Sequence, residues 1–495
     1  MKLEDIIDGI HVKSVSGSTA VEVSGVFYDS RKVVAGGVFF ALEGLGADGH
    51  DYLGQAIENG AVAIVSERPN PAEFPATWLQ VGNARDAMGF AAAHFEGDPS
   101  LRFPVVGVTG TNGKTTTTFL IHHLFEVILR RAGLIGTIHY STGGALAASP
   151  HTTPESPDLQ RLLGEMVEND CRGVAMEVSS HGLSQGRAKG VEFDVAVFTN
   201  LTQDHLDFHG TMDNYYAAKR RLFEQMDAQS AKKGVALINT DDPYGERLIK
   251  EPLERIKKFS FGRGAGADFQ ASDLRSDFDG TQFKLSFRER SFLVRIPLIG
   301  SFNVYNALAA IASGYAIGLN LREIVASMAN APQVPGRLEA VGNRQINYRV
   351  FVDYAHTPDA LVSVLDTLQG LQPNRIITVF GCGGDRDVLK RPLMAQAAEQ
   401  GGDYCILTSD NPRTEDPELI VEDARKGFRE QNHEVVLDRA QAITRAIDMA
   451  GERDIVLIAG KGHETYQEIN GVRYDFDDRS VAASRINRKA ERGGQ

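Results

Sequence analysis

Short runs of β-branched and other apolar residues recur along the chain, and a polar or glycine-rich turn and then a helical pattern follow them. One series occupies residues 103–109, 173–177, 195–199 and 235–239, and a second occupies residues 348–353, 375–380, 404–408 and 454–459. Near-continuous apolar strands that alternate with helices are typical of parallel sheets covered on both faces. We therefore predict two α/β domains, each built on its own parallel sheet.

The rest of the chain predicts how these domains are connected. Residues 1–97 contain strand-like runs near 25–28 and 61–65, so we expect a small N-terminal α/β module that ends at Glu96-Gly-Asp-Pro99. The Pro/Gly-rich stretch at residues 331–337 is typical of a linker. Alternating apolar and polar residues from about 268 to 295 predict an antiparallel hairpin added to the middle domain. The expected domains are residues 1–97, 98–333 and 334–495.

Composition excludes several classes of protein. The 495 residues are 42% hydrophobic and 24% charged, as in a globular protein, and the net charge of -13 argues against a general binder of nucleic acid or anionic membranes. Cys171, Cys382 and Cys405 cannot form a disulfide framework and lack paired metal-binding spacing, which favours a reducing cytoplasm. The acidic N-terminus predicts no signal peptide, and every apolar run is far shorter than the ~20 residues of a membrane helix.

A glycine-rich turn follows the first strand of the middle domain. Gly110-Thr-Asn-Gly-Lys-Thr-Thr116 opens the helical run from Thr117. Glycines let backbone N–H groups close around phosphate, Lys114 can reach the terminal phosphates, and Thr115 can offer its hydroxyl to Mg²⁺. The strict P-loop pattern has glycine where this chain has Val108, so a turn without a ligand is the alternative. The order strand, turn and helix favours a nucleoside triphosphate site.

Two further strands of the middle domain end in groups that can bind a metal ion. One ends in Glu177-Val-Ser-Ser-His181, and another ends in Asn200-Leu-Thr-Gln-Asp-His205. Mg²⁺ prefers oxygen, so Glu177 is a natural ligand and His205 a less usual one. An isolated histidine is more often structural. The carboxyl ends of strands in an open α/β sheet meet at one edge, however, and the glycine-rich turn lies there too.

The last domain gathers charged groups of both signs at its strand ends. Its four predicted strands end in the segments 353–356, 381–387, 410–413 and 460–464. Glycine-rich and Asp-rich turns are common at such ends, but they do not account for Arg386, Arg413 and Glu464 together. Two guanidinium groups suit carboxylates, and a carboxylate suits an ammonium group. The set therefore predicts a zwitterionic amino acid as ligand and, with ATP, activation of a carboxylate followed by attack of an amine.

Several of these strings together resemble the Mur ligase family over the whole chain. They are Gly-Thr-Asn-Gly-Lys-Thr-Thr from Gly110, Met-Glu-Val-Ser-Ser-His from Met176, Asp-His-Leu-Asp-Phe-His-Gly from Asp204 and Gly-Ser-Phe-Asn-Val-Tyr-Asn-Ala from Gly300. The resemblance implies three α/β domains: an N-terminal UDP-binding module, a central P-loop ATPase domain with a parallel sheet, and a C-terminal Rossmann-like domain. It also implies a cytoplasmic, monomeric enzyme of peptidoglycan synthesis, and hence of cell shape and division, that uses ATP and Mg²⁺.

Within the family, Asp410-Asn-Pro-Arg413 resembles the motif of members that add meso-diaminopimelate to UDP-N-acetylmuramoyl-L-alanyl-D-glutamate. The reaction so implied begins with phosphorylation of the D-glutamyl side-chain carboxyl by ATP. The amino group of meso-diaminopimelate then attacks the acyl phosphate, and phosphate leaves. Phosphoryl transfer needs positioning and positive charge, and the tetrahedral intermediate needs similar stabilisation.

The resemblance also assigns roles to residues, motif by motif. For ATP it implies Gly110, Thr111, Asn112, Gly113, Lys114, Thr115, Thr116, Asn303, Asn306, Arg337 and Asp353. For the metal it implies Thr115, Glu177, His205 and Lys219, the last as a carbamate, with Lys114, Glu177, His205 and Lys219 as the catalytic set. For the UDP-linked substrate it implies Tyr28, Ser30, Gly46, Ala47, Thr152, Thr153, Ser179, Gln185 and Arg187. For diaminopimelate it implies Arg386, Asp410, Asn411, Pro412, Arg413, Gly460 and Glu464.

Two of these roles have a physical argument beside the resemblance. A plain ammonium on Lys219 would repel Mg²⁺, whereas a carbamate adds negative oxygens. Diaminopimelate differs from lysine by one distal carboxylate, so an enzyme that selects lysine would leave Arg413 buried without a partner, which is costly. Arg413 is therefore the expected specificity residue. In the substrate loop, Leu45 and Gly46 stand where some relatives carry polar side chains, which weakens the case for side-chain contacts there.

Three other functions remain open from the sequence. A related ligase could add lysine, or glutamate to folate; Asp410-Asn-Pro-Arg413 disfavours the first and the N-terminal module the second. A P-loop switch that binds a partner protein would hydrolyse ATP without an amino acid, but it gives no reason for Arg386, Arg413 and Glu464. A nucleic-acid-dependent ATPase is disfavoured by the net charge of -13 and the lack of a basic stripe.

Overall fold

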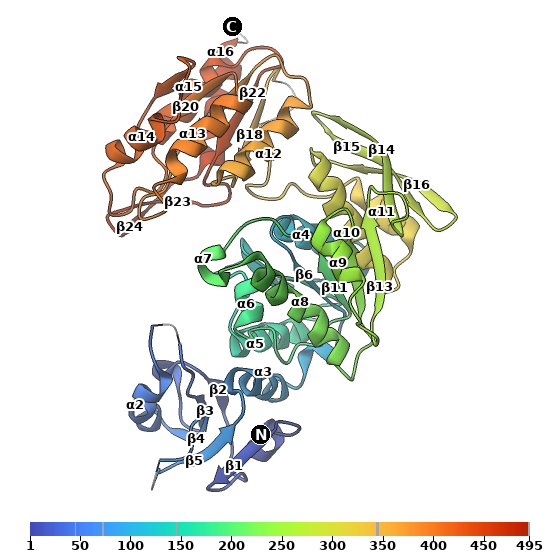
Figure 1. The fold of residues 1–495 in the computed structure, drawn as a ribbon, viewed down its shortest axis with the longest axis vertical. Coiled ribbons are helices and arrows are strands. Elements are labelled where there is room, and N and C mark those ends of the chain that lie inside the picture. The colour runs from blue at the N-terminus through green and yellow to red at the C-terminus, as the bar shows by residue number, and fades with distance from the viewer. Residues whose placement is uncertain (45, 72–73, 145, 343–345, 494–495) are drawn as a thin grey trace. The chain divides into compact units, whose positions relative to one another are not determined.

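The computed structural model describes residues 1–44, 46–71, 74–144, 146–342 and 346–493 of the chain. These residues divide into two compact units. The first contains residues 1–272, 285–292 and 305–328, and the second contains residues 273–284, 293–304 and 329–495. Helices cover sheets rich in parallel strands (Figure 1), which confirms the predicted α/β class.

The N-terminal module contains a five-stranded sheet in the order β1-β5-β4-β3-β2, in which only β1 runs antiparallel to its neighbour. Its elements are α1 (Leu3–Ile6), β1 (Val12–Ser16), β2 (Gly25–Phe27), β3 (Gly37–Phe40), α2 (Leu53–Glu58), β4 (Ala61–Ser66), β5 (Thr77–Val81) and α3 (Ala84–Phe95). Because side chains alternate along a strand, Phe40 packs in the core that includes α3, whereas Phe39 and Trp78 pack with α2 on the other face. The strands predicted near 25–28 and 61–65 are confirmed, and β1, β3 and β5 were missed.

The central domain is built on the sheet order β16-β15-β14-β13-β12-β11-β6-β10-β7-β8-β9. Its strands are β6 (Val105–Thr109), β7 (Gly133–Ile135), β8 (His139–Thr142), β9 (Leu146–Ala148), β10 (Val174–Glu177), β11 (Val195–Phe198), β12 (Val235–Asn239) and β13 (Lys257–Gly262), followed by β14 to β16. The pairs from β13 to β7 are parallel, whereas β8 and β9 are antiparallel additions. All four strands predicted for this domain are confirmed.

Helices connect these strands and supply the ends at which the site forms. They are α4 (Lys114–Leu129), α5 (Ser156–Glu168), α6 (Ser180–Ser184), α7 (Leu206–His209), α8 (Met212–Ala228), α9 (Pro243–Ile249), α10 (Ser301–Ala316) and α11 (Leu321–Met328). Strand β6 is buried along its whole length, as expected of a strand covered on both faces. The central strands therefore form a rigid frame from which the loops at their carboxyl ends project.

The segment from 268 to 295 differs from its prediction as a hairpin. It forms three consecutive strands, β14 (Phe269–Asp277), β15 (Gly280–Phe287) and β16 (Arg290–Ile296), at one edge of the central sheet. The apolar and polar alternation was recognised correctly, but the turn at Arg288 and Glu289 was missed. Arg288 adopts a left-handed conformation with φ of 53°, which a non-glycine residue rarely shows, so the sequence gave little indication of this second turn.

The C-terminal domain has a six-stranded sheet in the order β17-β18-β22-β19-β20-β21, in which only β17 is antiparallel to its neighbour. Its strands are β17 (Glu339–Val341), β18 (Arg349–Asp353), β19 (Ile376–Phe380), β20 (Tyr404–Leu407), β21 (His433–Val435) and β22 (Ile455–Ala459), and β23 (Tyr466–Ile469) and β24 (Val472–Asp475) form a separate ribbon. Helices α12 (Pro358–Gln369), α13 (Lys390–Gly401) and α14 (Pro417–Arg425) share one buried core, and α15 (Arg439–Met449) and α16 (Asp478–Gly493) share the other. The four predicted strands are confirmed.

No helix in the described part of the chain is long and apolar enough to cross a membrane.

A fully buried ion pair links two helices of the C-terminal domain. The guanidinium of Arg439 donates to both carboxylate oxygens of Asp478 at 2.7 Å, and both side chains have no exposed surface. Removal of one partner from a buried pair typically costs 3–5 kcal/mol because it leaves an uncompensated charge. We therefore expect Asp478→Ala to lower the free energy of unfolding by about 3–5 kcal/mol.

Denaturant unfolding followed by circular dichroism would measure this change. Asp475→Ala is the matched control, since Asp475 is exposed on β24 a short distance along the chain. Equal stability of the two variants would contradict a structural role for the buried pair.

Candidate active site

The glycine-rich turn connects the buried strand β6 to α4. The helix begins already at Lys114, earlier than the helical run that the sequence indicated from Thr117. Gly113 precedes it with φ of 86°, a left-handed conformation that favours glycine, and a Cβ on this residue would clash with the amide oxygen of Asn306. A Cβ on Gly110 would likewise clash with the Thr199 side chain. Both glycines are therefore required by the close packing of the turn, beside any role in phosphate binding.

Two lysines converge on the carbonyl oxygen of Gly110. Lys114 Nζ donates to this oxygen at 2.9 Å and to the Thr111 carbonyl at 2.8 Å, and Lys219 Nζ reaches the same Gly110 oxygen at 2.7 Å. Lys219 lies on α8 and is only 1% exposed. Its burial, with the nearby Lys114 charge as a smaller cause, holds its pKa well below the ordinary lysine value. Lys219, which from the sequence was one helix lysine among several, is therefore an unusual, neutral-leaning amine beside the turn.

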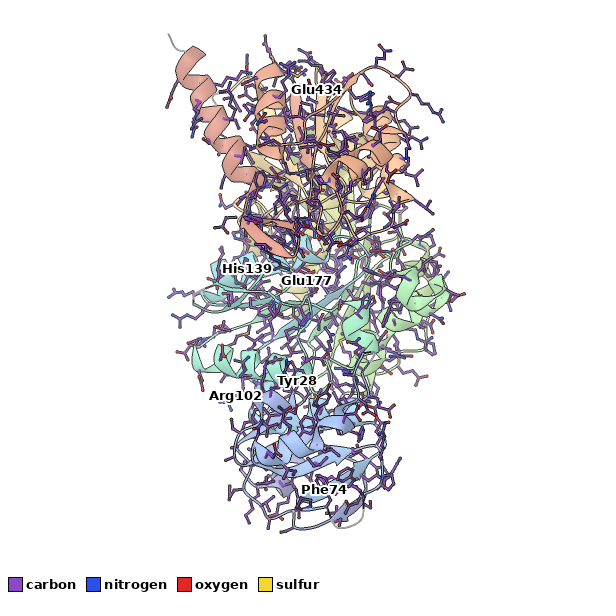
Figure 2. All side chains as sticks on the ribbon, turned by 90° about the vertical axis from the view of Figure 1, so that its left-hand side faces the viewer. Tyr28, Phe74, Arg102, His139, Glu177 and Glu434 are labelled. Atoms are coloured by element: carbon purple, nitrogen blue, oxygen red, sulfur yellow. The ribbon has the colours of Figure 1, made fainter. Side chains whose placement is uncertain are left out.

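Glu177 ends strand β10 and is 1% exposed (Figure 2). Its Oε2 accepts hydrogen bonds from the hydroxyls of Thr115 and Thr137 at 3.1 Å each, and its Oε1 accepts from the Thr137 backbone N–H at 2.8 Å. A hydroxyl and a carboxylate side by side at the start of α4 form the oxygen donor set that Mg²⁺ prefers. Thr115 and Glu177 thus fit the metal that the sequence predicts.

His205 lies close to other imidazole rings. It precedes α7 with φ of 52°, and its ring centroid is 4.9 Å from that of His181. Its Nε2 is 3.3 Å from Asp204, and partial burial lowers its pKa, so the ring favours the neutral form that binds metals. Its side chain is 45% exposed, in contrast to the buried Glu177.

The residues expected to hold the sugar and peptide are hydrogen-bonded to one another. Thr153 Oγ1 donates to the Glu177 carbonyl at 3.0 Å and lies 3.2 Å from Ser179 Oγ, while Arg187 donates to the Thr153 carbonyl at 3.0 Å. Thr152 Oγ1 is 3.0 Å from Thr137 Oγ1, which in turn bonds to Glu177. This group of residues is therefore directly connected to the expected metal ligand.

An acidic side chain links this group to the N-terminal module. Glu155 makes ion pairs with Arg187 at 3.0 Å and with Arg85 of α3 at 3.2 Å, and Arg85 also donates to the Gln185 carbonyl at 3.3 Å. Gln185 itself ends α6 through a backbone hydrogen bond to the His181 carbonyl at 3.0 Å. The expected substrate residues of the central domain thus lie at its junction with the first module.

The residues expected at the uridine end differ in exposure and in their contacts. Tyr28 donates to Asp158 at 2.7 Å, and Ser30 is buried with its hydroxyl bonded to Gln55 at 2.6 Å. Gly46 and Ala47 are exposed, and Leu45 lies outside the described residues. Ser30 therefore already has a protein partner, and only the loop at Gly46 presents an open surface.

The two asparagines expected beside adenine belong to helix α10. The Asn306 amide oxygen accepts a hydrogen bond from Thr117 at 3.2 Å, which places Asn306 against the first turns of α4. Asn303 donates to the Ile299 carbonyl at 2.7 Å. In the C-terminal domain, the guanidinium of Arg337 lies 5.0 Å from the Tyr354 ring, and Asp353 accepts hydrogen bonds from the backbone of Leu338 and Ala355.

The expected amino-acid site in the C-terminal domain combines exposed and buried charges. Arg413 adopts φ of 53°, donates to the Gly384 carbonyl at 2.6 Å, and has its Nε 3.8 Å from Glu468. The expectation that Arg413 has no partner without a second carboxylate is therefore wrong in this structure. Arg386 is exposed and donates to the Asp385 carbonyl at 3.3 Å. Pro412 and Arg413 follow Asp410 and Asn411, both of which are buried.

Comparison with known proteins identifies the family. The Mur ligase family catalytic domain matches residues 22–96, the Mur ligase middle domain matches residues 108–314, and the Mur ligase glutamate ligase domain matches residues 336–462. Two curated relatives named UDP-N-acetylmuramoyl-L-alanyl-D-glutamate–2,6-diaminopimelate ligase are similar over almost the whole chain. The one from Solibacter usitatus is 47% identical and covers 93% of each chain, and the one from Syntrophomonas wolfei is 43% identical over 99% of this chain and 100% of its own. The chain belongs to the Mur ligase family.

A solved structure extends this result to the fold. A structure of a UDP-N-acetylmuramoyl-L-alanyl-D-glutamate–2,6-diaminopimelate ligase is 36% identical, covers 99% of both chains and gives a TM-score of 0.74. The family membership that the sequence predicted is therefore confirmed, and with it the three-domain architecture of Mur ligases and their ATP-dependent formation of amide bonds.

One residue of this Mur ligase that the sequence analysis did not single out is Lys461. It is fully buried, and its Nζ donates to Asn411 Oδ1 at 2.9 Å and to Glu464 Oε2 at 3.2 Å. Asn411 also donates to Glu464 at 2.9 Å. Lys461 lies inside the quoted segment 460–464, but only its burial shows that it connects two of the expected amino-acid-binding residues. A Cβ on Gly460 would press against Asp410 at 2.7 Å, so this glycine is needed for close packing.

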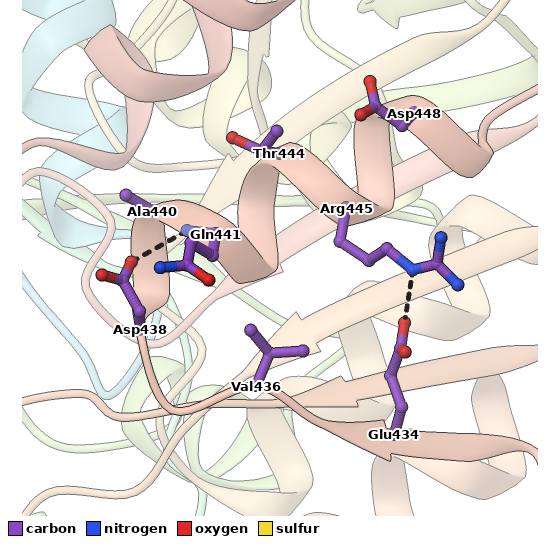
Figure 3. A pocket seen from close by; sticks show the side chains of 8 residues that line it. All are labelled: Glu434, Val436, Asp438, Ala440, Gln441, Thr444, Arg445 and Asp448. Atoms are coloured by element: carbon purple, nitrogen blue, oxygen red, sulfur yellow. Dashed lines mark hydrogen bonds and ion pairs between the residues drawn. The ribbon is translucent and has the colours of Figure 1, made fainter.

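Two surface hollows among the described residues contain none of the expected site residues. One of about 580 Å³ is lined by residues of β21 and α15, including Glu434, Arg445 and Asp448 (Figure 3). Arg445 is bonded to Glu434 at 3.1 Å across it. Glu43, Asp48 and His50 also converge, but Arg68 pairs with both carboxylates, which neutralises the charge that a cation would need. Neither feature includes a residue of the expected site.

The packing of the glycine-rich turn leads to a prediction for nucleotide binding. Gly113→Ala places a methyl group against Asn306 at a backbone conformation that disfavours any side chain. We expect affinity for ATP to fall by about 5- to 150-fold, in line with the strain of roughly 1–3 kcal/mol at such positions. Fluorescence titration with a labelled ATP analogue would measure this. Gly54→Ala is the control, because no atom lies within 4 Å of its added Cβ, and an equal loss of affinity in both variants would contradict the argument.

Proposed function

We propose that this Mur ligase joins meso-diaminopimelate to the D-glutamyl residue of UDP-N-acetylmuramoyl-L-alanyl-D-glutamate, with ATP as the source of energy, in peptidoglycan synthesis. The observation that carries this proposal is the full-length similarity, at 47% and 43% identity, to ligases of that name. The P-loop with Glu177 beside it and the charged site of the C-terminal domain supply the two halves of such a reaction.

The first half is transfer of the γ-phosphoryl group of ATP to the D-glutamyl carboxylate. The N–H groups at the start of α4 favour the phosphate charge, and Lys114 needs only to exchange its bonds to the turn for bonds to phosphate oxygens. A phosphorus–oxygen bond to the carboxylate forms as the bond to ADP breaks. The positive charge of Lys114 stabilises the negative charge that spreads over the transferred oxygens.

The second half is attack of the diaminopimelate amine on the acyl phosphate. A carbon–nitrogen bond forms, the amine loses a proton, and phosphate leaves with the electrons of the carbon–oxygen bond. The amine must be neutral to attack. Residues that bind the other charged groups of diaminopimelate would hold this amine in position. Arg386, Arg413 and Glu464, with Asp410, Asn411, Pro412 and Gly460, are the proposed contacts.

The metal ligands in this proposal are Thr115, Glu177, His205 and Lys219. Bound Mg²⁺ would neutralise charge on the phosphates. Thr115 and Glu177 support the assignment through their shared hydrogen bond. Lys219 would take part as a carbamate, and its burial supports this: a depressed pKa keeps the amine neutral, the form that reacts with carbon dioxide.

The other assignments keep their expected roles. ATP would contact residues 110–116 together with Asn303, Asn306, Arg337 and Asp353. The UDP-linked substrate would contact Tyr28, Ser30, Gly46, Ala47, Thr152, Thr153, Ser179, Gln185 and Arg187. We further propose that the enzyme works as a monomer in the cytoplasm, without nucleic acid or membrane as partner, and contributes to cell shape and division through the wall that it helps to build.

Release of phosphate from ATP tests the function directly. Purified enzyme with Mg²⁺ and UDP-N-acetylmuramoyl-L-alanyl-D-glutamate should release phosphate with meso-diaminopimelate and much less with L-lysine. Equal release of phosphate without the acceptor or the amino acid would contradict the ligase function and favour a nucleotide switch. Turnover with lysine would support the ligase function but contradict the proposed specificity for diaminopimelate.

Arg413 offers a sharper test of specificity. We expect Arg413→Ala to raise KM for diaminopimelate by about 10- to 100-fold, because a charged hydrogen bond to the second carboxylate is lost. The rise in KM should stay below the roughly 10⁴-fold discrimination of sites in which a missing substrate group leaves a protein polar group wholly unpaired. The reason is that Gly384 and Glu468 already contact Arg413. Steady-state kinetics would measure it, with Arg425→Ala on the exposed face of α14 as control. An unchanged KM for diaminopimelate would contradict the assignment of Arg413 as the specificity residue.

A further inference from the structure

Helix α8 carries two adjacent tyrosines and the buried Lys219. Tyr215 and Lys219 are four residues apart, so they lie on the same face of the helix, whereas Tyr216 faces a different neighbour. Tyr215 and Tyr216 are each 1% exposed. The two rings are thus equally buried, but they belong to different surroundings.

The Tyr215 ring lies between charged and aromatic groups of the site. Lys219 Nζ is 4.4 Å from the ring centroid, so the end of this side chain packs against the aromatic face. The His209 ring stacks on Tyr215 with centroids 4.8 Å apart and an interplanar angle of 29°. Lys219 Nζ also donates to the Gly110 carbonyl at 2.7 Å, so the ring and this carbonyl together hold its nitrogen in place.

The hydroxyl of Tyr215 contacts the glycine-rich turn. Thr111 Oγ1 lies 3.2 Å from Tyr215 Oη and accepts a hydrogen bond from the Thr202 backbone N–H at 3.1 Å. In this contact the Thr111 hydroxyl donates to Tyr215 Oη. Burial raises the pKa of Tyr215 to about 12, so its phenol stays neutral. Through these contacts Tyr215 connects the phosphate-binding turn, Lys219 and the loop that carries His209 and His205.

We propose that Tyr215 is a positioning residue that fixes Lys219 and Thr111 relative to each other. The inference rests on the proposed function, in which the turn binds the phosphates of ATP and Lys219 takes part in the metal site beside it. A purely structural Tyr215 is the alternative, because any buried ring contributes to stability. The two roles differ in what they change: positioning alters nucleotide binding and turnover, whereas packing alters unfolding.

Tyr216 provides a closely matched control. Its hydroxyl bonds to Glu251 at 3.2 Å and the guanidinium of Arg247 lies 4.4 Å from its ring centroid. It therefore has the same burial, a hydroxyl contact and a cation over the ring, but none of these contacts involves the turn or Lys219. A structural effect of losing a tyrosine hydroxyl should be similar at both positions.

The experiment compares four variants of the full chain. Tyr215→Phe keeps the ring and removes the hydroxyl, and Tyr215→Leu removes both. Tyr216→Phe and Tyr216→Leu make the same changes at the neighbouring residue. For each, calorimetry measures affinity for ADP with Mg²⁺, thermal unfolding measures stability, and phosphate release with the acceptor and diaminopimelate gives kcat and KM.

We expect Tyr215→Phe to weaken ADP binding and raise KM for ATP by about fivefold, the effect of one hydrogen bond, with kcat little changed. Tyr215→Leu should in addition lower kcat at least about tenfold, because Lys219 loses the ring that packs against the end of its side chain. The Tyr216 variants should match the wild type in kcat and in ADP affinity, and KM for diaminopimelate should stay unchanged throughout.

Equal ADP affinity and equal KM for ATP in Tyr215→Phe and Tyr216→Phe would overturn the proposal. Should Tyr215→Leu not fold, Tyr215→Phe still decides the outcome, because it removes a single atom. If the wild type binds ADP but releases no phosphate with the acceptor, the proposed function fails, while the ADP affinities still test the link between Tyr215 and the turn.

Discussion

Two lysine side chains share one backbone carbonyl, that of Gly110, and this close approach of Lys114 and Lys219 shapes the rest of the central site. Burial and the nearby Lys114 charge disfavour a second charge here, so the pKa of Lys219 lies well below its ordinary value. The site can hold both side chains because the turn offers carbonyl oxygens and the Tyr215 ring lies against Lys219. The charge of Lys114 and the N–H groups at the start of α4 suit the negative charge of a triphosphate.

The carboxylate of Glu177 completes this arrangement from the neighbouring strand. Because β6 and β10 are adjacent and parallel, the end of one strand delivers the turn and the end of the other delivers the carboxylate. Thr115 and Thr137 hold that carboxylate, and the Thr153 hydroxyl bonds to the same residue's carbonyl. The same few hydrogen bonds therefore place the proposed metal ligand Glu177 and the expected substrate residues, so a substitution at one should shift the others.

The C-terminal domain also buries charged side chains, but there the buried cations Lys461 and Arg439 are each paired with an opposite charge. Lys461 is neutralised by Glu464 and bonded to Asn411, and Arg439 by Asp478. Lys461 thereby connects Asn411, two residues before Arg413, to Glu464. Partners of both signs held in this way suit the proposed binding of a zwitterionic amino acid.

The local pattern of the sequence determined the buried parallel strands and the glycine-rich turn after β6, because a strand covered on both faces must be apolar and the crowded positions of such a turn, Gly110 and Gly113, leave no room for a Cβ. It also determined the family, through strings such as that from Asp204 to Gly210. Only the tertiary structure decided which groups touch. The burial of Lys219 and Lys461, the partner of Arg413 at Gly384 and the contact between Tyr215 and Thr111 join residues far apart in the chain. The third strand in the segment from 268 to 295 depended on a left-handed arginine that propensity disfavours. Contacts of this kind are set by how strands and helices pack, and no local pattern encodes them.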